Sequence, residues 1–399
     1  MTTPMQATSK FSRILLYSHD TFGLGHIRRS RTIANAITGS DDKATALILT
    51  GSPVAGRFSF PKRVDHIRLP GVTKMTDGSY ISETLGMDIN DTTSLRSGLI
   101  ASTLQHFSPD LVIVDKEPTG FRGELLPSLK WLKKHRPNTK IVLGLRDVLD
   151  DPKLLAKEWA RKGAVEAAES FYDELWVYGL KSIYDPLAGL ALSDATKART
   201  YWTGYLRREN LDAPQPQSDP YILITPGGGG DGAAMVDHVL SAYEQDLTLT
   251  PNALLVYGPF LTGDDRTAFE TRVAKLNGRV KTVGFDSHME TLMTGAVGVV
   301  AMGGYNTFCE ILSFNKPAVI IPRTKPRLEQ YIRAKRAEDL GLMRMVHKER
   351  DGDSPCVMST AIRNLSQQSP PSAIQIDGLL DGLDIVVKRT KNLLRKTDK

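Results

Sequence analysis

The sequence predicts an α/β protein built from two doubly wound, Rossmann-like domains that face each other across a cleft. Three observations predict this fold class. At 399 residues the chain exceeds the ~250–300 residues at which a single hydrophobic core stops growing. Apolar runs of strand length alternate with helix-compatible stretches in both halves. Each half also opens with an apolar run that leads into a glycine turn, as a βαβ unit does.

The first half carries six strand-like runs, several of them continuously apolar, as expected for parallel strands covered on both faces. They lie at 14–18, 46–50, 66–69, 111–115, 141–145 and 175–178. The run 201–204 closes this half, and the proline-rich polar segment 212–220 is typical of a linker. We therefore place an N-terminal domain at 1–211 and a linker at 212–220.

The second half repeats the alternation of strands and helices. Its strand-like runs lie at 221–225, 253–257, 280–285, 297–302 and 318–322, with a short one at 342–346. The segment 378–394 has leucines and valines at helical spacing, which predicts an amphipathic helix. We therefore place a C-terminal domain at 221–376 and a terminal helical segment at 377–399.

The composition is that of an ordinary globular protein, with 41% hydrophobic and 24% charged residues. No run approaches the ~20 consecutive apolar residues of a transmembrane helix. The segment 1–10 is polar and lacks the apolar core of a signal peptide, so we expect a cytoplasmic protein. Cys309 and Cys356 provide neither a disulfide framework nor a metal cluster.

The net charge of +6 has three interpretations: a solvated basic surface, an anionic substrate, or the anionic face of a membrane. Because no aromatic residues interleave with the basic clusters and no recognition motif is present, the sequence predicts no nucleic-acid partner. Peripheral association with the inner membrane face stays open.

The second glycine turn, at 227–232, matches the dinucleotide fingerprint G-x-G-x-x-G, which alone is a weak signal. A dinucleotide site also needs an acid at the end of the next strand, and none follows the run 253–257. The lysine and hydroxyl of a P-loop are missing as well. The remaining interpretations are a nest of backbone N–H groups for a diphosphate, or a tight turn without a ligand.

A third pattern lies between residues 297 and 330. A strand ends at two glycines and is followed by a helix-compatible stretch, which we expect Asn306 to cap. Glu310, in the early turns of that helix, is placed to accept hydrogen bonds from vicinal ribose hydroxyls. The alternative is that Glu310 is a surface residue of the helix and that the polar loop at 323–330 is merely solvated.

Taken together, these segments resemble a GT-B glycosyltransferase, in particular the MurG-like group that transfers N-acetylglucosamine from a UDP donor. The resemblance covers both halves and is strongest between residues 227 and 341. It implies the GT-B fold, a nucleotide-sugar donor in the C-terminal domain, and a C-terminal helix that packs back toward the N-terminal domain.

The resemblance also implies which residues hold each part of the donor. The diphosphate is assigned to the glycine loop, with a basic side chain from the interdomain segment 203–208: Gly228, Gly229, Gly230, Asp231, Gly232 and Arg208. The nucleoside is assigned to a Phe-x-x-x-Met pattern and the glutamate: Phe285, Met289 and Glu310. The donor sugar is assigned to the small-residue turn and a polar pair: Gly304, Tyr305, Asn306, Thr307, Glu329 and Gln330.

The N-terminal domain follows the family less closely. The family's Gly-Gly-His turn corresponds to Leu24-Gly25-His26, with Leu24 in place of a glycine. Tyr205-Leu206 replaces an Asn-Pro pair of the interdomain segment. The acceptor is therefore not assumed to be a lipid-linked peptidoglycan precursor.

Glycosyl transfer needs a base for the acceptor hydroxyl, and His26 is the first candidate, because its unperturbed pKa is near ~6.5 and it follows the first strand. His19, with Asp20 beside it, is the competing base. The alternative is that His26 only packs against or caps the first helix. Backbone N–H groups and the helix dipole can stabilise the leaving diphosphate, so we expect no metal and no cofactor. The pattern Asp351-Gly352-Asp353 is more typical of a solvated turn than of a metal site.

The charged group at 115–117 ends a strand of the buried type, where three charges are unusual. One interpretation is that Lys116 and Glu117 recognise the acceptor, together with Gly25. The other is that the charged group is a structural salt-bridge cluster.

We therefore expect an inverting, metal-independent glycosyltransferase that moves a hexose or N-acetylhexosamine from a nucleotide donor to a hydroxyl of a carbohydrate or lipid-linked acceptor. We expect the nucleotide of the donor to be UDP. Two alternatives stay open: a nucleotide-sugar epimerase or hydrolase of the same fold, and a non-catalytic nucleotide-sugar-binding protein.

Overall fold

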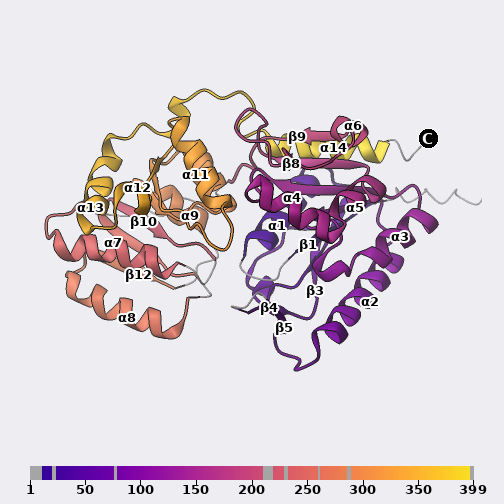
Figure 1. Cartoon of the computed structure of the whole chain (residues 1–399), viewed down its shortest axis with the longest axis horizontal. Coiled ribbons are helices and arrows are strands. Elements are labelled where there is room, and N and C mark those ends of the chain that lie inside the picture. The colour runs from indigo at the N-terminus through magenta and orange to yellow at the C-terminus, as the bar shows by residue number, and fades with distance from the viewer. Residues whose placement is uncertain are drawn as a thin grey trace, which may run out of the picture.

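The computed structural model describes residues 11–19, 24–75, 79–209, 219–228, 232–258, 261–284 and 289–395. Within this part of the chain, two open parallel sheets form two α/β domains that lie side by side (Figure 1). The prediction of two doubly wound domains is therefore confirmed.

The sheet of the N-terminal domain has seven parallel strands in the order β3-β2-β1-β6-β7-β8-β9. Their bounds are β1 Ser12–Ser18, β2 Ala44–Thr50, β3 Val64–Arg68, β6 Leu111–Asp115, β7 Lys140–Arg146, β8 Glu174–Tyr178 and β9 Thr200–Trp202. Every residue of β6 and of β8 is buried, which explains why the stretches 111–114 and 175–178 are apolar without alternation. The antiparallel pair β4 (Val72–Lys74) and β5 (Tyr80–Ser82) was not predicted.

The sheet of the C-terminal domain has six parallel strands in the order β12-β11-β10-β13-β14-β15. Their bounds are β10 Tyr221–Thr225, β11 Asn252–Val256, β12 Val280–Val283, β13 Gly298–Ala301, β14 Ala318–Ile320 and β15 Arg344–Met345. All six predicted strands are present, although β12 ends two residues before the predicted end of its run.

Helices cover both sheets (Figure 1). In the N-terminal domain they are α1 Gly25–Ser40, α2 Ile89–Phe107, α3 Leu126–His135, α4 Pro152–Lys162, α5 Ala164–Phe171 and α6 Asp194–Ala198. The C-terminal domain contributes α7 Ala233–Gln245, α8 Gly263–Val273, α9 Met289–Gly295, α10 Tyr305–Ser313, α11 Glu329–Asp339, α12 Lys348–Asp351 and α13 Pro355–Arg363. Short 3₁₀ turns lie at Ala55–Arg57, Phe121–Gly123, Ala274–Leu276, Asn364–Gln367 and Pro371–Ala373.

The last helix, α14 (Gly382–Arg395), returns to the N-terminal domain, as the family resemblance implies (Figure 1). Val386 and Leu393 of the predicted apolar stripe are buried. Arg389 donates to the buried Glu174 on β8, with a distance of 3.1 Å from Nε to Oε2. The helix therefore fastens the end of the chain to the domain in which the chain began.

The strand orders locate the crevice of each sheet. In the N-terminal sheet the chain leaves β1 toward β2 on one side and returns to β6 on the other. In the C-terminal sheet β10 lies in the same way between β11 and β13. Open α/β sheets bind ligands at such reversal points, outside the carboxyl ends of the strands. These points lie after Ser18 and Asp115 in one domain and after Thr225 and Ala301 in the other.

Candidate functional site

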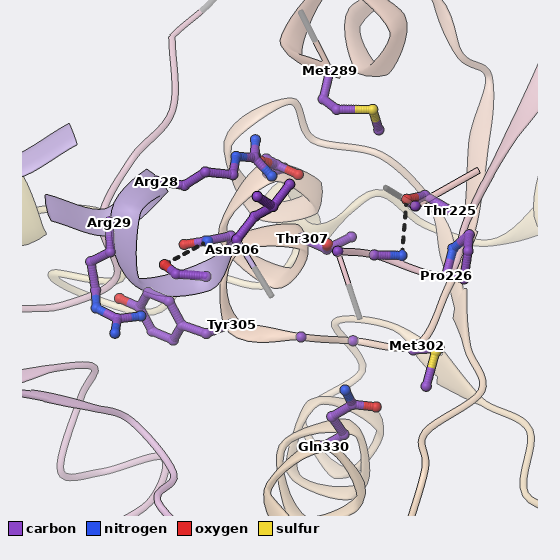
Figure 2. Close-up of a pocket in the computed structure, with 18 of the residues that line it drawn as sticks. Arg28, Arg29, Thr225, Pro226, Met289, Met302, Tyr305, Asn306, Thr307 and Gln330 are labelled. Carbon is purple, nitrogen blue, oxygen red and sulfur yellow. Dashed lines mark hydrogen bonds and ion pairs between the residues drawn. The ribbon is translucent and has the colours of Figure 1, made fainter. Parts of the chain in front are cut away.

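A pocket lies between the two domains at these carboxyl ends (Figure 2). The N-terminal domain lines it with the start of α1, the end of the 3₁₀ turn Ala55–Arg57 and the end of β7: Leu24, Gly25, His26, Arg28, Arg29, Phe58 and Arg146. The C-terminal domain lines it with the loops after β10, β11, β13 and β14 and with residues of α9, α10 and α11: Thr225 to Gly228, Val256 to Gly258, Met289, Met302 to Thr307, Glu310, Arg323, Glu329 and Gln330. The pocket therefore brings most of the predicted site residues together.

The glycine turn after β10 forms one wall of the pocket. Gly227 has a φ of +84°, which only glycine adopts readily, and its N–H donates to Thr225 Oγ1 over 3.3 Å. At Gly232 an added Cβ would lie 2.2 Å from Cβ of Pro226, so no side chain fits there. Both glycines are thus required by local geometry. Gly229, Gly230 and Asp231 lie outside the described residues.

Leu24 of the N-terminal domain lies directly against this turn. A Cβ added at Gly228 would be 3.0 Å from Leu24 Cγ. The leucine that replaces a family glycine therefore packs on the backbone of the opposite domain.

The part of the pocket near the predicted nucleoside residues contains a buried carboxylate. Glu310 on α10 is 1% exposed, and its Oε1 accepts from Arg28, which reaches across from α1. Arg28 also donates to Glu290 on α9 over 3.2 Å. Burial raises the pKa of Glu310, and the Glu290 carboxylate adds to this, while Arg28 opposes it. Glu310 Oε2 is buried without a hydrogen-bond partner among the described residues.

The other two predicted nucleoside residues are less informative. Met289 lines the pocket at the start of α9 (Figure 2). Phe285 lies outside the described residues.

The turn before α10 and the first turn of that helix contact the N-terminal domain. Gly303 has a φ of +77°, and a Cβ there would lie 2.7 Å from Ile320 Cγ2. The prediction that Asn306 caps α10 is wrong, because Gly304 is the N-cap residue and Asn306 lies in the first turn. Asn306 instead donates to the carbonyl of Gly25 over 3.0 Å and accepts from Arg208 over 2.8 Å. An amide that binds the other domain is not available to cap its own helix.

Two further residues of this turn differ in what they offer a ligand. Tyr305 points toward the N-terminal domain, where its hydroxyl donates to the carbonyl of Tyr178 over 3.0 Å. Any contact of Tyr305 with a donor sugar would therefore come from its backbone. Thr307 lines the pocket, as do Thr225 and Pro226 (Figure 2).

The predicted polar pair Glu329-Gln330 begins α11 and lines the pocket. Glu329 Oε1 accepts from Arg323 over 2.9 Å, and Gln330 Oε1 accepts from the Arg323 N–H over 3.2 Å. Arg146 of the N-terminal domain lies 3.9 Å from Glu329 Oε2. Burial opposes the charged form of Glu329, but these arginines and Arg333 lower its pKa. Its carboxylate therefore stays charged at the edge of the pocket.

His26 forms the centre of the opposite wall. It lies in the first turn of α1, and its Nδ1 is 2.5 Å from Oδ2 of Asp115, the last residue of β6. Burial lowers the pKa of His26, and Arg29 and Lys116 add to this, while Asp115 opposes it. With Nδ1–H donated to Asp115, Nε2 keeps the lone pair that a base needs.

His19 is the weaker of the two candidate bases. It is 8% exposed and is not among the residues that line the pocket. Burial lowers its pKa well below the usual range. Its ring packs edge-on against His26, with 5.6 Å between ring centroids. Its proposed carboxylate partner, Asp20, lies outside the described residues.

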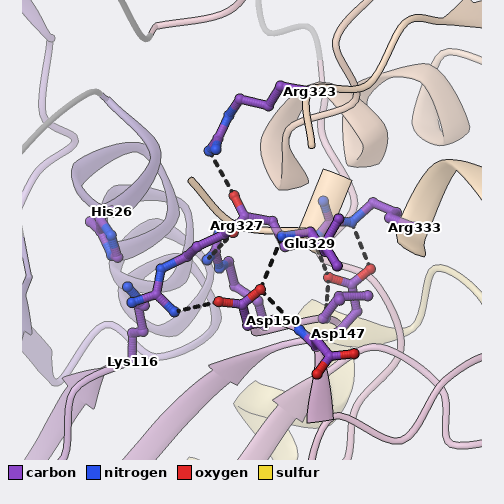
Figure 3. Close-up of polar contacts among 12 residues, drawn as sticks. His26, Lys116, Asp147, Asp150, Arg323, Arg327, Glu329 and Arg333 are labelled. Atoms are coloured by element: carbon purple, nitrogen blue, oxygen red, sulfur yellow. Dashed lines mark hydrogen bonds and ion pairs between the residues drawn. The ribbon is translucent and has the colours of Figure 1, made fainter. Parts of the chain in front are cut away.

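The charged group at the end of β6 divides into two parts. Asp115 binds His26 and Arg29, whereas Lys116 and Glu117 pair with each other over 3.5 Å. Glu117 also accepts from Lys162 over 2.9 Å (Lys116 appears in Figure 3). Burial lowers the pKa of Lys116 to about 8. Neither Lys116 nor Glu117 lines the pocket, so both stay predicted acceptor ligands beside it.

Two other predicted elements lie away from the pocket. Arg208 is buried at the domain interface, where it donates to Thr32 and to Asn306, and does not line the pocket. In the Asp351-Gly352-Asp353 pattern, the carboxylates pair with Arg350 and Lys348. No group of three or more metal-binding side chains occurs in the described ranges.

A network of ion pairs fastens α11 to the N-terminal domain beside the pocket (Figure 3). The buried Arg333 donates to Asp147 through Nε over 2.8 Å and Nη2 over 2.6 Å. Arg327 donates to Asp150 over 3.2 Å, and the Leu328 N–H donates to the same carboxylate over 2.9 Å. This network holds the loop of Glu329 against the wall that carries His26.

The comparisons with known proteins agree with this geometry. Residues 222–368 match the glycosyltransferase family 28 C-terminal domain. The match covers the glycine turn, the Glu310 helix and the Glu329-Gln330 pair. No curated protein has a sequence significantly similar to the chain.

Solved glycosyltransferase structures match the whole length of the chain. TcCGT1 in complex with UDP matches with a TM-score of 0.70 and 12% identity, over 97% of this chain and 100% of that one. A UDP-glucosyltransferase from Polygonum tinctorium matches with a TM-score of 0.62 and 13% identity, over 98% and 100%. MurG of Acinetobacter baumannii matches with a TM-score of 0.53 and 12% identity, over 94% and 99%. At such low identities, these structural matches show the fold alone, which is GT-B. Together with the family match, they confirm a glycosyltransferase of the GT-B type.

The sequence reasoning missed four functional candidates: Arg28, Arg29, Asp115 as the partner of His26, and Arg146. The available signal for Asp115 was its place at the end of a strand. Only the order of the strands shows that this end adjoins the start of α1.

Proposed function

We propose that the protein is an inverting, metal-independent glycosyltransferase that moves a hexose or N-acetylhexosamine from a UDP-linked donor to an acceptor hydroxyl. One observation carries the proposal. His26, held by Asp115, lines the same pocket as the glycine turn and Glu310 of the other domain. In the proposal, the base thus acts across the pocket from the turn that holds the diphosphate. The UDP complex and the UDP-glucosyltransferase among the similar structures support a uridine donor.

In the proposed reaction, His26 Nε2 takes the proton of the acceptor hydroxyl. The hydroxyl oxygen forms a bond to the anomeric carbon while the bond from that carbon to the diphosphate oxygen breaks, and the electron pair leaves with UDP. Attack comes from the wall opposite the leaving group, so the configuration at the carbon inverts. Asp115 holds the ring tautomer and stabilises the imidazolium that forms.

The leaving diphosphate needs stabilisation by groups on the C-terminal wall. We assign this to the backbone N–H groups of the glycine turn and to the N-terminus of α7 behind it. Arg28, which lines the same pocket, is an additional cation within the donor end. The mechanism thus asks for no metal, and full activity in excess EDTA is the expected result; loss of activity on chelation, restored by a divalent cation, would contradict it.

The donor class is tested first by thermal shift with UDP, ADP, GDP and their sugars. We expect UDP compounds to raise the midpoint most, because a bound ligand stabilises the folded state by mass action. Release of UDP without an acceptor, or an epimerised sugar, would instead favour the epimerase or hydrolase alternative. Tight UDP binding without turnover would favour a non-catalytic binding protein.

We further propose that the N-terminal domain contacts a membrane surface that presents a lipid-linked acceptor. Between Asp91 and His106, α2 has no exposed charged side chain, since Arg96 is buried against Glu124. Apolar side chains that are at least 38% exposed gather on β5, α2 and the segments beside them: Met75, Ile81, Leu85, Met87, Leu95 and Leu99. None of the described helices is long and apolar enough to cross a bilayer.

The membrane proposal predicts co-sedimentation with vesicles of mixed zwitterionic and anionic lipid. The double variant Leu95→Ser/Leu99→Ser should bind them less, while Leu247→Ser, which removes a leucine exposed on the other domain, should bind as the wild type does. Equal binding by both variants would exclude this surface.

A further inference from the structure

Arg29 is a buried arginine beside the proposed base, and the mechanism above gives it no role. Its side chain is 1% exposed, on the turn of α1 that follows His26. It donates to Asp115 three times: from Nε to Oδ1 over 2.9 Å, from Nη2 to Oδ1 over 2.7 Å, and from Nη2 to Oδ2 over 2.6 Å. Burying a charge destabilises a folded protein unless the charge is paired. Here the Asp115 carboxylate is the partner of the buried guanidinium.

The geometry places Arg29 and His26 on the same carboxylate. Asp115 Oδ2 receives both the Arg29 guanidinium and the His26 ring, and Arg29 Nη2 lies 3.1 Å from His26 Nδ1. Two donors so close to each other repel most strongly when the imidazole is also charged. Arg29 therefore disfavours the protonated form of His26 while it fixes the carboxylate that orients the ring.

The donor domain also contacts Arg29. The ring of Tyr305 lies 5.5 Å from the guanidinium carbon, and Tyr305 directly follows Gly304 in the pocket wall. Tyr305 is in turn held by its hydrogen bond to Tyr178. The arginine is thus enclosed by both domains, with 1% of its side chain exposed.

We propose that Arg29 is a positioning residue that keeps Asp115 ionised and His26 neutral, so that the base is ready at and below neutral pH. The inference rests on the proposed function, in which His26 is the base. Among the described residues, the charged or titratable groups that face His26 are Asp115 and Lys116 from the end of β6, His19 from the end of β1, and Arg29 from its own helix. Of these, Asp115 favours the imidazolium, and Arg29 and Lys116 oppose it.

The test follows the titration of His26 in the full chain labelled with [15N]histidine, with the signal assigned by its loss in His26→Ala. Arg29→Gln should raise the pKa of His26, because a positive charge next to the ring is removed. Arg31→Gln is the matched control: it removes an arginine of the same helix that donates to the Ser59 carbonyl over 2.8 Å and does not contact Asp115. An unchanged pKa in folded Arg29→Gln, or an equal rise in Arg31→Gln, would overturn the inference.

Turnover of the UDP-sugar gives the second readout. In Arg29→Gln the ratio of kcat/KM at pH 8 to that at pH 6 should rise about threefold over wild type, since more of the base is protonated at the lower pH. If Arg29→Gln does not fold, Arg29→Lys decides. It keeps the charge, so the pKa of His26 should stay near the wild-type value, but it cannot fork onto both oxygens, so kcat should fall about tenfold. Wild-type kcat in Arg29→Lys would overturn the inference.

These outcomes separate this inference from the proposed function. If His26→Ala keeps wild-type turnover, or no UDP-sugar is consumed at all, the proposed function fails. If the transferase is active and depends on His26, but the titration does not respond to Arg29, only the inference about Arg29 fails.

Discussion

The two walls of the cleft offer a ligand different kinds of groups. The C-terminal wall offers mainly backbone, at the turns after β10 and β13, with Glu310 and Glu329 as its carboxylates. The N-terminal wall offers side chains that bind one another, with His26, Asp115 and Arg29 in direct contact. A wall of backbone suits a phosphate group that recurs in many donors, whereas a wall of paired side chains suits chemistry on one particular acceptor. The two walls can therefore be tested by separate substitutions, and Arg28, which contacts both, tests the link between them.

The largest expected effect comes from the N-terminal wall. His26→Ala should lower kcat by about 10²–10⁴-fold, the range that a general base contributes. The UDP-induced thermal shift should stay at the wild-type size, because the donor binds the other wall. Single-turnover kinetics and a thermal-shift titration measure the two effects. Near-normal turnover would remove His26 from the mechanism.

On the C-terminal wall, Gly232→Ala should weaken UDP binding about tenfold and destabilise the domain by about 1–3 kcal/mol, because its Cβ would overlap Pro226. Calorimetric titration and urea unfolding measure the two. Gly263→Ala is the matched control, since an added Cβ there meets no atom within 4 Å. If Gly232→Ala binds UDP normally, the turn is structural and does not hold the diphosphate.

Arg28 links the two walls, and its removal should have a smaller effect of the opposite sign. Arg28→Gln should bind uridine about threefold more tightly, because the ribose no longer competes with a guanidinium for Glu310. Uridine is the probe because it carries no phosphate that Arg28 could contact. Arg31→Gln should bind uridine as the wild type does. Weaker binding by Arg28→Gln would show that Arg28 supports the nucleoside directly.

The smallest effects concern pH. The pKa of His26 is lowered, so the base is neutral at pH 7, and kcat/KM should fall only below pH 6.5. The pKa of Lys116 is lowered to about 8, so its charge is present below pH 8 and is lost above it. For an anionic acceptor, kcat/KM should therefore fall again above pH 8. A profile from pH 5 to 9.5 tests both limbs, and Lys116→Met should abolish only the alkaline one.

The fold was predictable because each core strand can be recognised from its own short stretch of sequence. Runs such as 111–114 and 221–224 are apolar along their whole length, and a glycine turn follows shortly after the second of them. The pair β4–β5 was missed because its strands have three residues each and are partly exposed, so they carry no clear pattern.

The residues that line the C-terminal wall could be predicted for the same reason, since they follow one another along the chain. Gly25 and His26 of the N-terminal wall could be predicted too, but the contacts among its side chains could not. His26 and Asp115 are separated by 89 positions in sequence, and only the adjacency of β1 and β6 brings them together. Arg28 and Glu310 come from different domains, so no local pattern indicates their pairing.

The return of the chain to its first domain has a mechanical consequence. The polypeptide crosses between the lobes twice, and the crossings lie together: the Tyr205 N–H donates to the Leu379 carbonyl over 2.7 Å, and Leu206 pairs with Asp381. The two domains are therefore joined by two adjoining connections rather than by one flexible linker. Two adjoining connections restrict how far the lobes can twist or slide past each other more than a single linker would. They therefore favour one fixed register between the two surfaces of the cleft.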